Sequence, residues 1–270
     1  MNDDSFIERI LYKLVKRHVS GTTMSSALDK AKDLNSKNLH VSITFLSNSV
    51  ATRQKAKYAT TTYLELIRQI SRLGLKASIQ VPLSQLGLGM DENTMLENLG
   101  EIIKVGNKYG VFVWAEIPQG YSFDSTQFDS ARGFGIATHA AGMLKTVTAH
   151  KHIKSLKIIF SKSDLEVAGA DEFAKQLAGM NLSNTVMLSP PDSVIKKVLN
   201  GGRGKTAVIE FRFGENSKKI KSLAERGTRA SVYLPFGKDW QAYAINNVPE
   251  GYMRFLAAKF LTEADEKNTM

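Results

Sequence analysis

The chain has 270 residues, of which 43% are hydrophobic, so it can bury a large core and is not predicted to be disordered. Its 36 lysines and arginines outweigh 26 acidic residues and give a net charge of +10, but the basic residues do not cluster enough to indicate a nucleic-acid-binding surface. The absence of cysteine excludes disulfides, thiolate metal sites and cysteine nucleophiles.

The N-terminal stretch mixes charges into its apolar positions, and the apolar runs of the chain are much shorter than a membrane span. We therefore expect no signal peptide, no transmembrane segment and a cytoplasmic location. Apolar residues spaced three and four apart predict a first helix over residues 6–15, and a second helix is predicted over 25–34. Both precede the repeating part of the chain and are expected to cover one end of it.

From residue 40 onward, runs rich in β-forming residues alternate with helical patterns. The helical segments are long enough to connect parallel strands that are buried on both faces. The predicted strands are 40–47, 76–84, 111–117, 133–140, 156–162, 185–190, 206–214 and 230–237. The predicted helices that follow them are 52–73, 92–109, 125–131, 142–150, 164–178, 194–199, 217–226 and 239–261.

Eight strand and helix units in about 250 residues match a (β/α)8 barrel of the TIM type. The predicted fold class is therefore α/β, a TIM-type barrel with extra N-terminal helices. No linker rich in proline, glycine or serine divides the chain, so the helices of residues 1–38 and the barrel of 39–270 are expected to form one continuous domain. A doubly wound open sheet is the alternative fold.

Isolated motifs do not identify a function. The segment 200–206 resembles the end of a P-loop, but it follows a helix and enters a strand, so it is interpreted as a helix C-cap turn. The five histidines lack metal-ligand spacing, and His150 and His152 are expected at the surface. No metal site is predicted.

The barrel fold itself narrows the search, because chemistry in this architecture lies on the loops that follow the strands. Polar residues at these strand ends are therefore candidate site residues. They include Gln85, Glu116, His139, Ser189 and Arg212.

Four stretches, taken together, resemble the proline dehydrogenase family of flavin-dependent barrels, which oxidise proline to pyrroline-5-carboxylate. They are "ALDKAKDLNSKNLHVSITFLS", "ASIQVPLSQLGL", "VFVWAEI" and "VYLPFGKDWQAY". The resemblance extends from about Gly21 to Leu261, and the last stretch is its most specific part. It also accounts for helices ahead of the first barrel strand.

The chain departs from the family at residues that hold the substrate carboxylate. Where the family has Tyr-x-x-Arg-Arg, Tyr243 matches but the two arginines are replaced by Asn246 and Asn247. The family's lysine before its Thr-Gln-Leu-Gly falls at Pro82. On the flavin side, a family arginine corresponds to Lys157 and a family lysine to Phe160.

The resemblance implies a flavoenzyme that oxidises proline or a related amine, with FAD as cofactor, a small-molecule substrate and an unknown electron acceptor. It assigns catalytic roles to Glu116 and Tyr243. Gln85, Asn246 and Asn247 would bind the substrate, whereas Lys157, His139, Ser189 and Arg212 would contact the flavin.

The alternative is a catalytically inactive barrel that acts as a binding or assembly module. Because Trp114 and Glu116 differ by two positions, both should face the barrel interior, with Glu116 at its mouth.

Overall fold

The structure is a computed structural model of the chain. It describes residues 18–47, 52–119, 121–123, 125–128, 131–150, 152–161, 170–200, 207–215, 217–240 and 243. The predicted first helix (6–15) lies outside the described residues, and so do most of the predicted closing helix (239–261) and most of the P-loop-like segment (200–206).

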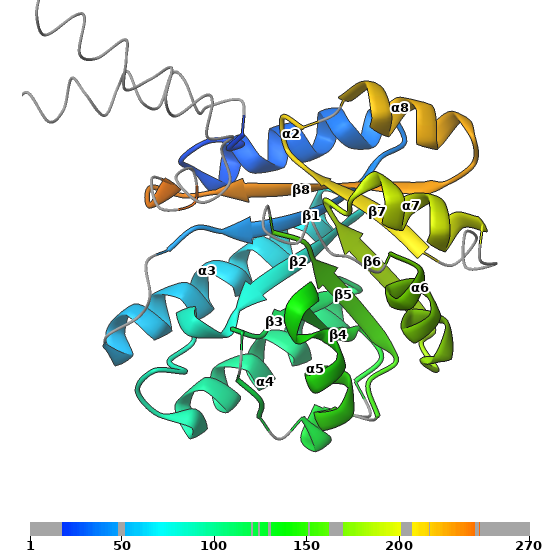
Figure 1. Ribbon diagram of the computed structural model, residues 1–270. Coiled ribbons are helices and arrows are strands. Elements are labelled where there is room, and N and C mark those ends of the chain that lie inside the picture. Colours follow the sequence, from blue (N-terminus) through cyan, green and yellow to red (C-terminus); the bar gives the residue numbers. More distant parts are fainter. Residues whose placement is uncertain are drawn as a thin grey trace, which may run out of the picture.

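Eight parallel strands form a closed barrel in which strand order follows chain order and β8 pairs with β1 (Figure 1). The closed sheet confirms the (β/α)8 prediction and excludes the open doubly wound sheet. The strands are β1 (His40–Phe45), β2 (Ala77–Pro82), β3 (Val113–Glu116), β4 (Phe134–His139), β5 (Ser155–Ile159), β6 (Asn184–Leu188), β7 (Ala207–Arg212) and β8 (Arg229–Phe236).

Helices surround the barrel and begin and end where the sequence supplies caps (Figure 1). The side chains of Thr23, Thr52 and Asp91 accept hydrogen bonds from backbone N–H groups in the first turns of three helices. The helices are α2 (Met24–Ser36), α3 (Arg53–Arg72), α4 (Glu92–Tyr109), α5 (Met143–Ala149), α6 (Ala170–Gly179), α7 (Asp192–Val198) and α8 (Ser217–Glu225). Short 3-10 turns occur at η1 (Leu83–Gln85), η2 (Thr126–Phe128) and η3 (Ala140–Gly142). Of the helix predicted over 125–131, the described residues show only η2.

The sequence analysis expected the leading helices to cover one end of the barrel. The structure shows instead that α2 packs along the outside of β1 and β8. The chain ahead of it is tied to the end of β8, because the Ser20 hydroxyl donates a hydrogen bond to the Pro235 carbonyl at 2.7 Å. The backbone N–H of Gly237 in turn donates to the Gly21 carbonyl at 3.1 Å. This segment therefore braces the seam where the barrel closes.

Alternation along the strands creates two separate apolar cores. Val41, Ile43 and their equivalents on other strands face the helices and form the larger core. The opposite parity faces the barrel interior, where Trp114 is 3% exposed and packs with Ala137 and Val186. Trp114 therefore lies in the interior, as its spacing from Glu116 predicted.

Gly135 on β4 makes room for the Trp114 ring. A Cβ atom at residue 135 would lie 2.6 Å from Cζ3 of Trp114 and 2.8 Å from Cβ of Ser155. Both distances are far below van der Waals contact, and Ser155 contributes rigid backbone nearby. Any side chain at position 135 would therefore displace the indole or bend the strand.

We expect Gly135→Ala to lower the free energy of unfolding by about 1–3 kcal/mol through overpacking. Urea denaturation would measure the loss. Gly179→Ala is the matched control, because nothing lies within 4 Å of the added methyl group. If both variants change stability equally, the close packing around Gly135 does not exist.

Candidate active site

A buried ion pair occupies the middle of the barrel interior. Nζ of Lys157 lies 2.5 Å from Oε2 of Glu210, and the two side chains are 0% and 2% exposed. Lys157 also donates to the Ser42 hydroxyl at 2.9 Å, and the Ser231 hydroxyl donates to Oε1 of Glu210 at 2.9 Å. The pair thus links β1, β5, β7 and β8 across the interior.

Two aromatic rings enclose the Lys157 ammonium. Nζ lies 5.8 Å from the Trp114 ring centroid and 5.5 Å from the Tyr233 centroid, within the range of cation–π attraction. Burial lowers the pKa of Lys157, and the neighbouring Glu210 carboxylate acts in the opposite direction. The ammonium is therefore held by partners inside the barrel, and the Lys157 side chain is 0% exposed.

The ion pair separates two cavities. Trp114 and Glu210 line a cavity at the N-terminal end of the strands, whereas Tyr233 lines one at the C-terminal end. We name the C-terminal one the mouth cavity. It measures about 420 Å³ and is lined by Gln80, Glu116, His139, Ile159, Ser161, Leu188, Arg212, Glu215, Tyr233 and Tyr243.

Four of the predicted site residues meet in the mouth cavity. Glu116, His139 and Arg212 are the last residues of β3, β4 and β7, and Tyr243 joins them from the segment after β8. The Tyr243 ring lies 6.3 Å from that of Tyr233, and burial raises the pKa of both phenols. This grouping follows from the parallel barrel, which brings the C-terminal ends of all strands together.

Glu116 is oriented by its neighbour on β2. Nε2 of Gln80 donates a 2.7 Å hydrogen bond to Oε2 of Glu116. Because a carboxylate accepts and the amide nitrogen donates, this bond fixes the direction of the Gln80 amide. Oε1 of Gln80 is buried and has no hydrogen-bond partner among the described residues, so an acceptor lies beneath the mouth.

Arg212 stands between the mouth cavity and a second cavity of about 380 Å³, which it also lines. Its guanidinium donates to the Phe160 carbonyl at 2.9 Å. Ser189 lines only the second cavity, where its hydroxyl donates to Glu215 at 2.9 Å. Ser189 is thus adjacent to the mouth rather than in it.

The other predicted residues do not enter the mouth. Gln85 is 4% exposed, and its amide group donates to the Phe45 carbonyl at 2.9 Å and accepts from the Tyr63 hydroxyl at 3.0 Å. These bonds brace η1 against the end of β1. Lys157 lies below the mouth in the ion pair, and Asn246 and Asn247 lie outside the described residues.

The sequence analysis missed four inward-facing residues of the mouth cavity, namely Gln80, Ile159, Leu188 and Tyr233. Ile159 and Leu188 end β5 and β6, which the sequence analysis had extended to residues 162 and 190, whereas Gln80 and Tyr233 lie before the last residues of β2 and β8. Their inward parity, which Glu116 and Arg212 share, was available in the sequence, but only residues at the predicted strand ends were considered.

The predicted surface position of His150 is wrong. It is 3% exposed rather than at the surface, and Nδ1 lies 2.8 Å from the Ser125 hydroxyl oxygen. Its ring packs against Phe123 with the centroids 5.2 Å apart. His152 is exposed as expected.

Among the described residues, no three histidine or acidic side chains come together as a metal site would require. The part of the chain that the structure describes also contains no helix long and apolar enough to cross a membrane.

Comparison with known proteins confirms the resemblance to the proline dehydrogenase family. No family model matches the chain. The chain is 25% identical over 270 residues to proline dehydrogenase of Deinococcus radiodurans, covering 89% of this chain and 87% of that protein. It is 24% identical over 260 residues to proline dehydrogenase 1 of Bacillus subtilis strain 168, covering 87% and 86%.

Solved structures share the fold. Proline utilization A from Bdellovibrio bacteriovorus, inactivated by N-propargylglycine, superposes with a TM-score of 0.73 at 15% identity. The match covers 92% of this chain and 34% of that one, so the chain spans about a third of that longer protein.

We expect Lys157→Met to lower the free energy of unfolding by about 3–5 kcal/mol, because it leaves Glu210 buried without its cation. The double variant Lys157→Met, Glu210→Leu should recover most of this loss, since it removes both charges. Urea denaturation of the two single variants and the double variant gives the coupling energy.

The control is Lys197→Met, which breaks the surface ion pair with Asp171, where both side chains are at least half exposed. That change should cost less than about 1 kcal/mol. A Lys157→Met variant no less stable than Lys197→Met would contradict the buried pair.

Proposed function

We propose that this relative of the proline dehydrogenases is a flavin-dependent oxidoreductase that oxidises proline or a related secondary amine in the mouth cavity. One observation carries the proposal: a chain similar to proline dehydrogenases along nearly its whole length brings Glu116, His139, Arg212 and Tyr243 around one cavity. Lys157, Gln85 and Ser189 have other partners, so we do not assign them direct roles in that cavity.

The mouth cavity suits a flavin ring. Its volume of about 420 Å³, with the adjoining 380 Å³, lies in the range of cofactor sites. Ile159 and Leu188 offer an apolar surface for a flat ring system. Arg212 and His139 supply donors that would hold the polar edge of the ring, and Arg212 is placed to reach the second cavity as well.

Oxidation of a secondary amine to an imine removes a hydride from carbon and a proton from nitrogen, and leaves a C=N double bond. A bound flavin would supply the hydride acceptor. The Glu116 carboxylate can accept a hydrogen bond from the neutral secondary amine of the substrate and receive the single proton that nitrogen gives up. Oε1 of Gln80, buried beside it without a described partner, adds a second acceptor below the same spot. Tyr233 and Tyr243 exclude water from one side.

Recognition of a substrate carboxylate is weaker here than the resemblance alone implies. Pro82 ends β2 directly beside Glu116 and has no cation to offer. Asn246 and Asn247 replace two arginines of the family with neutral amides. Among the residues that line the mouth cavity, Arg212 is the guanidinium available to an anion. Proline should therefore bind weakly. The missing cations should reduce the affinity for an amine without a carboxylate less than the affinity for proline.

The comparisons do not favour the alternative of an inactive binding module, because the curated relatives are named as dehydrogenases. A cytoplasmic location, a small-molecule substrate and an electron acceptor outside the chain complete the proposal.

Protein purified without added cofactor, or after incubation with FAD, should show flavin absorbance in the visible range. We expect Arg212→Gln to raise the FAD dissociation constant at least about tenfold, because it removes a charge-assisted hydrogen bond. Quenching of flavin fluorescence measures the constant. Lys104→Gln on the exposed face of α4 is the control and should leave it unchanged. A parent protein that binds no flavin would overturn the proposal.

Introducing the family's two arginines at positions 246 and 247 tests how the substrate carboxylate is recognised. Each charge-assisted hydrogen bond is worth about 1.5–3 kcal/mol, so the loss of two predicts a Michaelis constant for L-proline about a hundredfold or more above that of an enzyme with the arginine pair. Steady-state oxidation with an artificial acceptor measures it. We expect Asn246→Arg, Asn247→Arg to lower the constant. Proline turnover by the parent at a low Michaelis constant would contradict this account of the carboxylate.

A further inference from the structure

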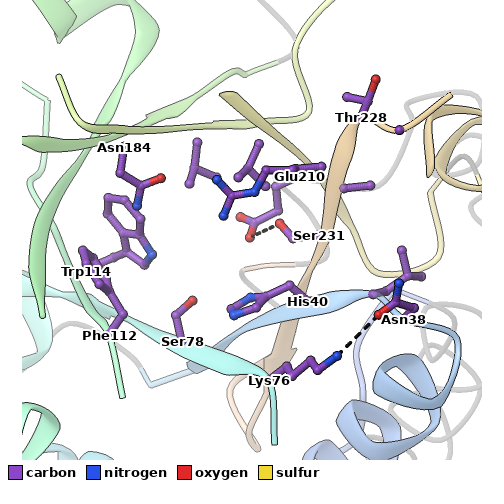
Figure 2. A pocket seen from close by; sticks show the side chains of 16 residues that line it. Asn38, His40, Lys76, Ser78, Phe112, Trp114, Asn184, Glu210, Thr228 and Ser231 are labelled. Atoms are coloured by element: carbon purple, nitrogen blue, oxygen red, sulfur yellow. Dashed lines mark hydrogen bonds between the residues drawn. The ribbon is translucent and has the colours of Figure 1, made fainter. Parts of the chain in front are cut away.

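The cavity at the N-terminal end of the strands lies at the opposite end of the barrel from the mouth cavity (Figure 2). We name it the lower cavity. It measures about 500 Å³, and neither the resemblance nor the proposed function uses it. In the close-up, His40 projects into it between Ser78, Lys76 and the Glu210 side chain, with Trp114 and Asn184 on the far side (Figure 2).

Small side chains leave space in the lower cavity, because Ser78 and Ser231 are the residues that line it on β2 and β8 above Lys76 and Arg229. An eight-stranded barrel normally fills its interior with bulky branched residues. Above the cavity, Trp114 and the Lys157–Glu210 pair close it from the mouth.

The two walls of the lower cavity differ in chemistry. Basic side chains come from three neighbouring strands or the turns before them: Arg229 of β8, His40 of β1 and Lys76 just before β2. The other strands contribute the apolar side chains of Phe112, Trp114, Val186 and Val208, together with the polar side chains of Asn184 and Glu210. Such a cavity matches a ligand with an anionic group at one end and an apolar body at the other.

The positive charge of this wall is not neutralised within the described residues. Glu210 is the carboxylate that lines the cavity, and its charge is already matched by Lys157 at 2.5 Å. No carboxylate in the described part of the chain lies within 4.0 Å of Lys76 or Arg229. The Lys76 ammonium has only a 3.4 Å contact with the Asn38 side-chain oxygen (Figure 2).

His40 lies among both signs of charge. Desolvation is the main cause that lowers its pKa, the Glu210 carboxylate raises it, and the cations of Lys157 and Arg229 lower it again. An anion beside His40 would reverse these repulsions. A ligand cation would add to them, so charge selects the sign of the ligand.

We propose that the lower cavity binds a small organic anion. Its carboxylate or phosphate group lies against Arg229 and Lys76, and its apolar body lies against Phe112 and Val186. The site is independent of flavin and of the mouth cavity, because the ion pair lies between them.

Isothermal titration calorimetry with phenylacetate, benzylammonium and inorganic phosphate tests the proposal. Phenylacetate has both an anionic group and an apolar ring, whereas each of the other two lacks one feature of the predicted ligand. We expect saturable binding of phenylacetate, with phosphate at least about tenfold weaker and benzylammonium unmeasurable. Phosphate or benzylammonium binding as tight as phenylacetate would overturn the proposal, and so would the absence of saturable phenylacetate binding.

Substitutions of the basic residues that line the lower cavity test whether phenylacetate binds there. Arg229→Gln, Lys76→Gln should weaken phenylacetate binding at least about tenfold by removing its charge-assisted hydrogen bonds. Lys104→Gln, Lys108→Gln removes the same net charge from the exposed face of α4 and should change the dissociation constant less than about twofold, as expected for distant, independent sites. Equal loss in both pairs would show nonspecific attraction and contradict the proposal.

Arg212→Gln alters the mouth cavity and the cavity beside it but not the lower cavity, so it should leave phenylacetate binding intact. Loss of binding in that variant would place the anion in the mouth and overturn the lower-cavity site. Because every readout is binding, failure of the proposed oxidoreductase activity would leave this test unaffected.

Discussion

The ion pair between Lys157 and Glu210 is the constraint on which the rest of the barrel interior depends. Burying two opposite charges costs several kcal/mol per ion before their attraction is counted. Here the ion pair has further partners for its charges and its remaining hydrogen-bonding groups. The hydroxyl of Ser42 accepts from Lys157, and that of Ser231 donates to Glu210. The rings of Trp114 and Tyr233 lie within cation–π distance of the ammonium. An apolar filling would need none of these partners, so the pair fixes the geometry of the middle layer more than it adds stability.

That middle layer gives the two ends of the barrel different chemistry. Above it, the mouth combines the carboxylates of Glu116 and Glu215 with one guanidinium, and it lies where barrels of this kind carry their chemistry. Below it, Lys76 and Arg229 face a cavity whose carboxylate is already paired. These charges are the reason why we propose an amine as the ligand at the mouth and an anion as the ligand at the opposite end.

The periodicity of the sequence was sufficient to predict the fold. Eight β-rich runs separated by helical patterns correspond to eight strands in chain order, and the two-residue spacing of Trp114 and Glu116 placed both in the interior. Side-chain partners were harder to predict, because they depend on pairings between distant strands. The resemblance implies a flavin contact for Lys157, but it does not indicate the ion-pair partner Glu210, which is 53 residues away in sequence and two strands around the barrel. His150 was predicted at the surface but is buried, because its ring packs on Phe123 and pairs with Ser125, a contact that the sequence did not indicate.

We propose that the ion pair divides the barrel interior and that a flavin binds in the mouth cavity above it. A crystal structure of the protein reconstituted with FAD would locate the cofactor. We expect density for the ring system against Ile159 and Leu188 with its polar edge at Arg212 and His139, and an intact contact between Lys157 and Glu210 beneath it. Flavin density in the lower cavity, or a Lys157 side chain turned upward to contact the flavin, would contradict it.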